Sequence, residues 1–131
     1  DVQVVFQKQR VGAADGYTVF VSGSRVFLQV VSGSTTALVS GAMAQMPSFF
    51  AAVVDRSAST GSVRLYVGAT GSYPTLSDSA GVVFGSRFDL ASGSFYIGSG
   101  SVSGKVVRPF TGSLDDVKQI MESVPFGGSL L

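Results

Sequence analysis

Side chains that could perform catalysis are scarce in this sequence, which contains no histidine and no cysteine. A serine or cysteine nucleophile needs a nearby base to activate it, and histidine usually fills that role. Retaining glycoside hydrolysis instead needs two carboxyl groups about 5 Å apart. Glu122 is the single glutamate, and the adjacent Asp115 and Asp116 would point to opposite faces of a strand. We therefore predict that the chain is not an enzyme.

Metal binding would depend on aspartates, which occur singly along the chain until the pair at positions 115 and 116. Calcium usually needs two or more carboxylates together with carbonyl oxygens. Asp78 and Asp115 are the candidate ligands for such a site. The alternative, which we expect, is that the aspartates accept hydrogen bonds from their own backbone. The sequence therefore predicts no cofactor, and calcium is the one metal to test.

Carbohydrate binding usually needs an exposed aromatic ring beside a few polar groups. Tyr73 lies in the longest loop of the chain, directly before Pro74, and is the candidate for that ring. Arg87 and Arg108 are the candidate hydrogen-bond donors on neighbouring loops. The alternative is that Tyr73 folds over the end of the domain and that both arginines are solvated. The residues leave both possibilities open.

The charge content of the chain is low. Its 131 residues carry a net charge of +1, and 13% of them are charged, against about 25% in an ordinary domain. No basic run is present, so we predict no nucleic-acid partner. Val26–Val54 contains no charge, but Gly41 and Pro47 interrupt it, so we predict no membrane span. The start at Asp1, without a methionine or an apolar leader, favours a processed or excised segment.

Short runs of β-forming residues alternate with glycine and serine turns along most of the chain. Runs spaced by about ten residues are typical of a β-sandwich or barrel. Where polar and apolar residues alternate, Leu65 is expected to face the core, whereas Arg64 and Tyr66 face outward. A single domain over residues 1–131 is long enough to bury a core. The clearest runs are Tyr17–Val21, Arg25–Val31, Phe49–Val54, Val63–Val67 and Phe95–Ile97.

Three blocks of this pattern resemble laminin G-like domains. Phe49–Asp55 followed by Val63–Gly68 resembles their central hairpin, an aromatic "vavvyd" strand and then "vrlYvdG". Phe95–Gly98 resembles the "lyiG" strand, and Phe110–Val117 resembles the closing "F.G.iDDvri" strand. The chain departs from the family by having phenylalanine where tryptophan is usual and Val67-Gly68 where Asp-Gly is usual.

The resemblance implies an antiparallel two-sheet jelly-roll sandwich of the concanavalin A-like kind. It also implies that the first strands, expected before Val4, are absent or supplied from elsewhere, and that Leu114–Ile120 is a strand. Apolar residues at helical spacing after Gly112 indicate a short helix instead. We expect the strand, with a helical turn near Met121. Because this fold carries lectins, glycosidases, adhesion modules and structural domains, it does not specify the function.

Aromatic residues stand at strand positions that are expected to face outward. Exposed apolar patches of this kind usually mark an interface. The predicted outward positions hold Phe20, Phe27 or Leu28, Phe50, Tyr66 and Tyr96. We predict that Phe50, Tyr66 and Tyr96 form an interface, and that the chain self-associates or packs in a larger assembly. The contact would use an outer sheet face or the sheet edge near Val4.

Two functions fit these observations. The first is a non-catalytic recognition or adhesion module that binds a glycan or a protein. Such a module would act outside the cell, on a cell surface or on a virion. The alternative is a structural subunit of a homo-oligomer, filament, virion or larger complex, which the low charge favours.

Overall fold

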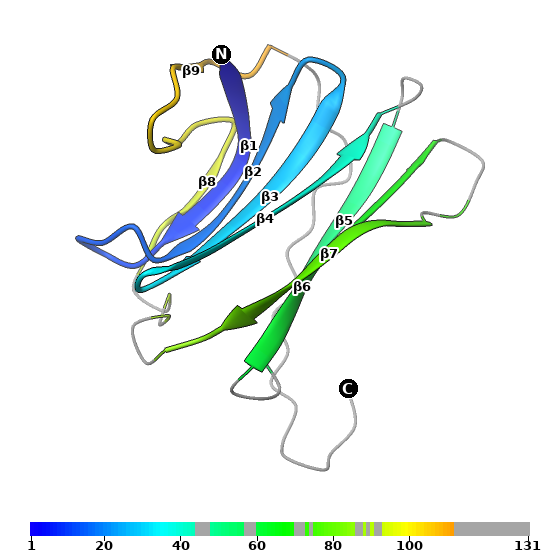
Figure 1. Cartoon of the computed structure of the whole chain (residues 1–131). Helices are drawn as coiled ribbons and strands as arrows, with labels where there is room; N and C mark the ends of the chain where they lie inside the picture. Colours follow the sequence, from blue (N-terminus) through cyan, green and yellow to red (C-terminus); the bar gives the residue numbers. More distant parts are fainter. Residues whose placement is uncertain are drawn as a thin grey trace.

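The computed structural model describes residues 1–43, 48–56, 60–69, 73, 75–85, 88, 90 and 93–111. Within these ranges the chain forms β-strands in two sheets and no helix, so the predicted all-β class is confirmed (Figure 1). Sheet A contains β1 (Val2–Gln9), β2 (Gly16–Ser22), β3 (Arg25–Ser32), β4 (Thr35–Ala42), β8 (Phe95–Ile97) and β9 (Val107–Arg108). Sheet B contains β5 (Ser48–Asp55), β6 (Thr60–Ala69) and β7 (Thr75–Val83).

Sheet A is built on a meander of its first four strands. Its order is β4-β3-β2-β1-β8, and β9 pairs with β1 in parallel, whereas the other pairs are antiparallel. Gly23 and Gly33 begin the two-residue turns of the β2–β3 and β3–β4 hairpins, and each has φ of 60°. Glycine adopts this left-handed conformation at little cost, so the Gly-Ser pairs specify the turns. Sheet B has the order β5-β6-β7 and is antiparallel throughout.

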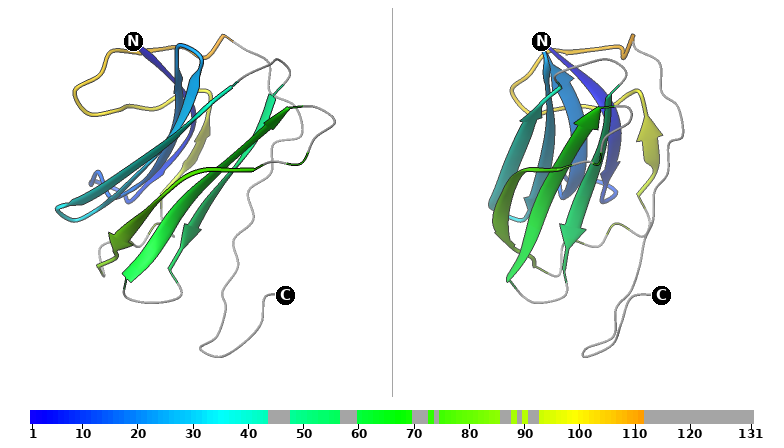
Figure 2. Two further views of the ribbon diagram at one scale, coloured as in Figure 1. Left: turned by 45° about the vertical axis from the view of Figure 1, so that its right-hand side comes forward. Right: turned by 90° about the vertical axis from the view of Figure 1, so that its right-hand side faces the viewer.

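The two sheets face each other as two layers with the core between them (Figure 2). Val63 and Leu65 are fully buried from sheet B, which confirms the face predicted for Leu65. They pack with sheet A side chains that recur at every second position of a strand, as the strand period requires. The buried members from sheet A are Val5, Val19, Val26, Leu28, Val30, Ala37 and Val39.

The two sheets are in contact where β4 meets β7. The Asp78 carboxylate accepts hydrogen bonds from the backbone N–H of Ser40 on β4, at 3.1 Å, and from that of Ser79, at 2.9 Å. Gly41 permits this approach, because a Cβ there would lie 2.8 Å from both Ser77 Cβ and Val67 Cγ2. The edge of sheet A at β4 is therefore covered by sheet B.

The outward predictions have mixed outcomes. Of the alternatives Phe27 and Leu28, Leu28 belongs to the core and Phe27 lies on the outer face. Phe20 lies on the outer face as predicted, but it is only 3% exposed. Phe50 is opposite Val67 on β6, so it lies on the inner face, and its ring centroid is 5.8 Å from that of Phe6. The prediction that Phe50 faces outward is thus wrong, and Phe49, at 37% exposed, takes the outer position.

The aromatic positions on β6 and β8 follow the prediction more closely. Tyr66 is half-buried outside the core cluster, and Tyr96 is 51% exposed. Phe95 packs inward, with its ring stacked on Phe6 at 5.8 Å. Ile97, which alternation places with Phe95, is more than half exposed. β8 is a three-residue strand at the margin of sheet A. An inward-facing side chain at a sheet margin has fewer neighbours to cover it, so alternation alone does not predict its burial.

The edge near Val4 is not open. β1 pairs with β2 on one side and with β8 and β9 on the other, so its backbone is flanked by strands of the same chain. This corrects the expectation that an open edge at Val4 provides the self-association surface. The predicted strand at Leu114–Ile120 lies outside the described residues, and the jelly-roll connectivity stays a prediction. No helix in the described ranges is long and apolar enough to cross a membrane.

Candidate functional site

The outer face of sheet A is partly covered by a later segment of the chain, Gly98–Arg108, which we call the strap (Figure 1). Val102, at the middle of the strap, is buried against this face. Phe20 and Phe27 lie beneath it with their rings stacked at 5.0 Å. The strap therefore closes a second, smaller apolar cluster, whose other members are Val2, Val4 and Val107.

Gln7 attaches the strap to the sheet. Its side chain is 3% exposed, and its Nε2 donates to Thr18 Oγ1 at 2.8 Å and to the Ser101 carbonyl at 2.5 Å. Its Oε1 accepts from the Ser101 N–H at 3.0 Å. The strap lies so close that a Cβ on Gly100 would be 2.6 Å from this oxygen. Both ends of the buried amide are satisfied, which favours one position of the strap.

A groove runs beside the strap on the same face. Its inner part has a volume of about 170 Å³ and lies between the strap and β1, β2 and β3. Its outer part has a volume of about 640 Å³ and extends towards the β1–β2 loop and β8. Gln9, Ala14 and Ser101 line both parts, so the two form one depression.

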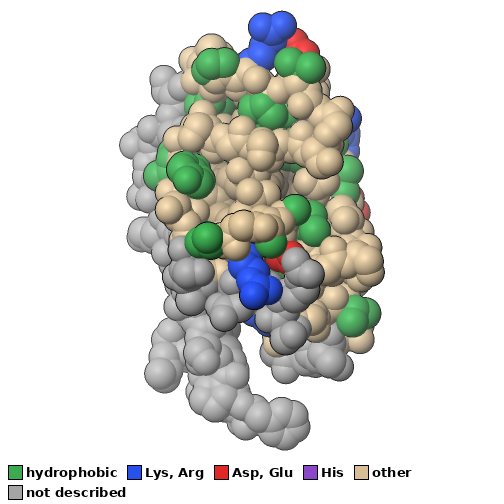
Figure 3. Space-filling view, turned by 90° about the vertical axis from the view of Figure 1, so that its left-hand side faces the viewer, with side chains coloured by type: hydrophobic (Ala, Val, Ile, Leu, Met, Phe, Trp, Pro, Cys, Tyr) green, Lys and Arg blue, Asp and Glu red, His purple; other side chains and the backbone are tan. Residues whose placement is uncertain are grey.

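The groove has a mixed lining, in which uncharged polar side chains alternate with alanine, valine and glycine. Arg10 is the one charged side chain among the described lining residues, and none of those residues is a carboxylate. The structure records no side-chain hydrogen bond for Gln9 or Gln29 within the ranges it describes. Figure 3, viewed from the strap side, shows few charged side chains over most of this surface. The polar lining residues are Gln9, Thr18, Gln29, Ser94, Ser101 and Ser103.

Tyr96 forms the aromatic side of the wider part of the groove. Its Cα pairs with that of Gln7 in the β1–β8 ladder, and Phe95 before it stacks on Phe6, which packs against the core. Alternation therefore directs Tyr96 to the outer face, where half of its surface is free. An exposed ring here can stack against an apolar face of a ligand.

The opposite wall is the β1–β2 loop, which buried Asp15 holds in place. The Asp15 Oδ2 accepts from the Gly33 N–H at 2.7 Å, and its carbonyl accepts from the Arg10 N–H at 2.7 Å. Gly16 has φ of 153°, and a Cβ there would overlap the Lys8 carbonyl oxygen. The loop is thus fixed to the neighbouring β3–β4 turn before any ligand binds.

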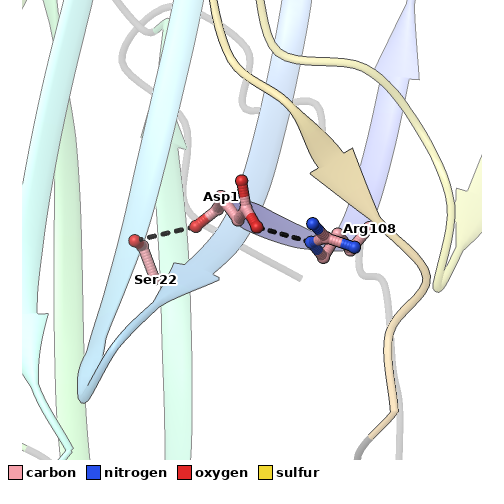
Figure 4. Close-up of polar contacts among 3 residues, drawn as sticks. All are labelled: Asp1, Ser22 and Arg108. Atoms are coloured by element: carbon pink, nitrogen blue, oxygen red, sulfur yellow. Dashed lines mark hydrogen bonds and ion pairs between the residues drawn. The ribbon is translucent and has the colours of Figure 1, made fainter.

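The residues predicted to bind a ligand are not brought together by the described structure. Tyr73 is 92% exposed in the β6–β7 connection, so the alternative in which it folds over the domain is wrong. Arg108 lies on β9, where its Nε pairs with the Asp1 carboxylate (Figure 4). The Asp1 carbonyl accepts from Ser22 Oγ at 3.1 Å. Arg87 lies outside the described residues.

Of the two candidate calcium ligands, the structure describes Asp78. Asp78 lies within β7 and not in a turn; it accepts a local hydrogen bond from the Ser79 N–H and a second one from the Ser40 N–H on β4. Asp115 lies outside the described residues. In the described ranges no three aspartate or glutamate side chains gather into a cluster that could hold a metal ion.

Comparison of the chain with protein-family models, with curated proteins and with solved structures finds no match. The laminin G-like resemblance therefore stays a prediction.

Sequence reasoning missed the polar residues of the groove. Gln7 and Gln9 stand two positions apart on one strand, and Gln29 interrupts an otherwise apolar run on another. Two-residue spacing places such amides on one face of a strand, so alternation alone could have predicted a polar patch on that face. The sequence does not show that a segment more than ninety positions later covers the same face, as the Gln7–Ser101 bond demonstrates.

Proposed function

We propose that this chain is a non-catalytic recognition module that binds an uncharged glycan in the groove beside the strap. The observation that carries the proposal is the combination of the half-exposed Tyr96 ring with an almost uncharged lining that mixes apolar and hydrogen-bonding side chains. Sugar hydroxyls donate and accept hydrogen bonds, and a glutamine amide offers both functions. The Tyr96 ring would contact the apolar face of a sugar ring.

The groove suits binding better than hydrolysis. Glycoside hydrolysis requires two carboxyl groups on either side of the bond to be cleaved. The described lining residues include none, and Asp15, the nearest in sequence to the groove wall, is buried beneath the β1–β2 loop. Arg10 adds a donor without supplying the acid or the nucleophile. A recognition or adhesion role on a cell surface or virion fits this arrangement.

Affinity electrophoresis against a panel of neutral polysaccharides tests the proposal. We expect retardation on at least one of them, and Tyr96→Ala should weaken that affinity by about 2- to 10-fold, the effect of losing one aromatic contact. Gln29→Ala should also weaken it. Tyr73→Ala is the matched control, because it removes an exposed tyrosine outside the groove.

Two outcomes would contradict the groove. If no neutral polysaccharide retards the protein, a glycan is not the ligand, and a protein partner becomes the remaining form of recognition. If Tyr73→Ala weakens binding while Tyr96→Ala does not, the ligand binds at the β6–β7 loop instead.

A structural subunit is the second candidate function. The observation that favours it is the outer face of sheet B, where Phe49, Leu76 and Val83 are exposed. Tyr66→Glu should weaken assembly without unfolding the domain, because the charge would be buried only in the assembled state. Native mass measurement of both forms tests this, and an unchanged monomer in both would exclude assembly through this face.

A further inference from the structure

The sheet edges of this molecule are not equally protected. The β4 edge is covered by β7, and the opposite margin of sheet A ends in β8 and β9, which contain three and two residues. Short or covered edges resist pairing with other chains. β5 differs, because it is eight residues long and, in the part of the chain that the structure describes, pairs with β6 alone.

β5 also lacks the other features that block edge pairing. Ser48–Val54 contains no charge and no proline, and its register with β6 has no bulge. The β1–β2 and β6–β7 pairs both contain register shifts. Ala51 and Ala52, at the middle of β5, are exposed. A bulge-free, uncharged edge of this length is a template for an added strand.

We propose that β5 pairs antiparallel with β5 of a second copy of this chain, forming one six-stranded sheet across a two-fold axis. The arrangement of charge supports a second copy as the occupant. The charged residues nearest in sequence to the middle of β5 are Asp55, its last residue, and Arg56, which follows it. Antiparallel pairing separates the two Asp55 side chains by roughly 20 Å, at 3.3 Å per residue, which exceeds the screening length in physiological salt. No like charges meet along the pair.

The side chains of β5 suit this pairing as well. The small Ala51 and Ala52 lie at the centre, so two copies can approach without steric conflict. Phe49 and Ala51 share the outer face with Tyr66 and Leu76, so pairing makes the exposed apolar surface of sheet B continuous across both copies. The low charge of the whole chain opposes association only weakly. Self-pairing is independent of glycan binding, because the groove lies on sheet A.

Sedimentation velocity over a range of concentrations, with Ala51→Lys, tests the proposal. We expect a dimer at micromolar concentration whose dissociation constant rises at least tenfold in Ala51→Lys. The two lysines would lie close to the two-fold axis, where like charges repel. Leu76→Lys is the matched control, since it adds the same charge to the same sheet face but on β7. It should leave the dissociation constant nearly unchanged, and circular dichroism should show that both variants fold.

Hydrogen exchange identifies the strand involved. β5 amides should exchange more slowly at high concentration than at low concentration, and this difference should disappear in Ala51→Lys. A monomer at high concentration overturns the proposal, as does a dimer that Leu76→Lys weakens equally, which would indicate packing through the sheet face. A monomer whose β5 amides are already protected also overturns it, because another part of the same chain would then occupy the edge.

Discussion

The outer faces of both sheets carry phenylalanine at strand positions, but within the described part of the chain only the phenylalanine of sheet A is covered by another segment. On sheet A, Phe20 lies beneath the strap and is almost fully buried. On sheet B, Phe49 stands at a comparable strand position and remains partly exposed. Strand alternation assigns both to an outer face and does not say which face another segment covers. The difference shows that burial on an outer face is determined by distant parts of the chain.

The two faces consequently suit different roles. Covering sheet A leaves a groove beside the strap, with polar side chains held in place by the strap and by the β1–β2 loop. On sheet B, apolar side chains are exposed next to β5, which pairs with β6 alone among the described residues. Fixed polar groups favour the binding of a small ligand, whereas apolar surface beside a free edge favours contact with another chain.

The largest expected difference between the faces is in stability. Phe20→Ala should lower the free energy of unfolding by about 3–5 kcal/mol, because it leaves a cavity between the strap and sheet A. Leu76→Ala on the outer face of sheet B should cost about 1 kcal/mol or less, since half of that side chain is already in water. Urea denaturation of both variants measures the two values. Similar losses would mean that the strap does not bury Phe20 in solution.

The attachment of the strap predicts a smaller effect. Gln7→Met keeps the length of the side chain but leaves Ser101 N–H and Thr18 Oγ1 without their buried partner, which should cost about 1–3 kcal/mol. Gln29→Met is the matched control on the same face and should change stability by less than about 0.5 kcal/mol. Hydrogen exchange should also show faster exchange at Ser101 in Gln7→Met. If the two variants are equally stable, the hydrogen bonds of Gln7 do not attach the strap to the sheet.

Much of the fold follows from local sequence. The alternation around Leu65 specifies the core face of β6, and the Gly-Ser pairs at positions 23 and 33 specify two hairpin turns. The assignment of Phe50 failed because Phe49 and Phe50 are equally apolar. Alternation requires one of them to face the core and the other to face outward, but it does not say which. Only the register with β6, which places Phe50 beside Val67, selects one.

Less of the candidate site follows from local sequence. Tyr96 was identified as an outward residue, but its place beside Gln9 requires the β1–β8 pairing between segments far apart in the chain. The strap itself has no strong local signal, because a glycine- and serine-rich segment is typical of a loop. Val102, one of the three valines of the strap, covers the sheet through contacts that alternation does not predict.

The smallest expected effect concerns the far end of the strap, where Arg108 pairs with Asp1. Both side chains are more than half exposed, so Arg108→Ala should cost about 1 kcal/mol or less, and molar salt should remove most of that difference because it screens exposed charges. Arg108 does not line the groove, so glycan affinity should stay within about 2-fold of the unsubstituted protein, a shift of less than about 0.5 kcal/mol. Denaturation at low and high salt, combined with affinity electrophoresis, separates the two effects. A loss of affinity as large as that of Tyr96→Ala would restore Arg108 as a ligand-binding residue and would extend the site along the whole strap.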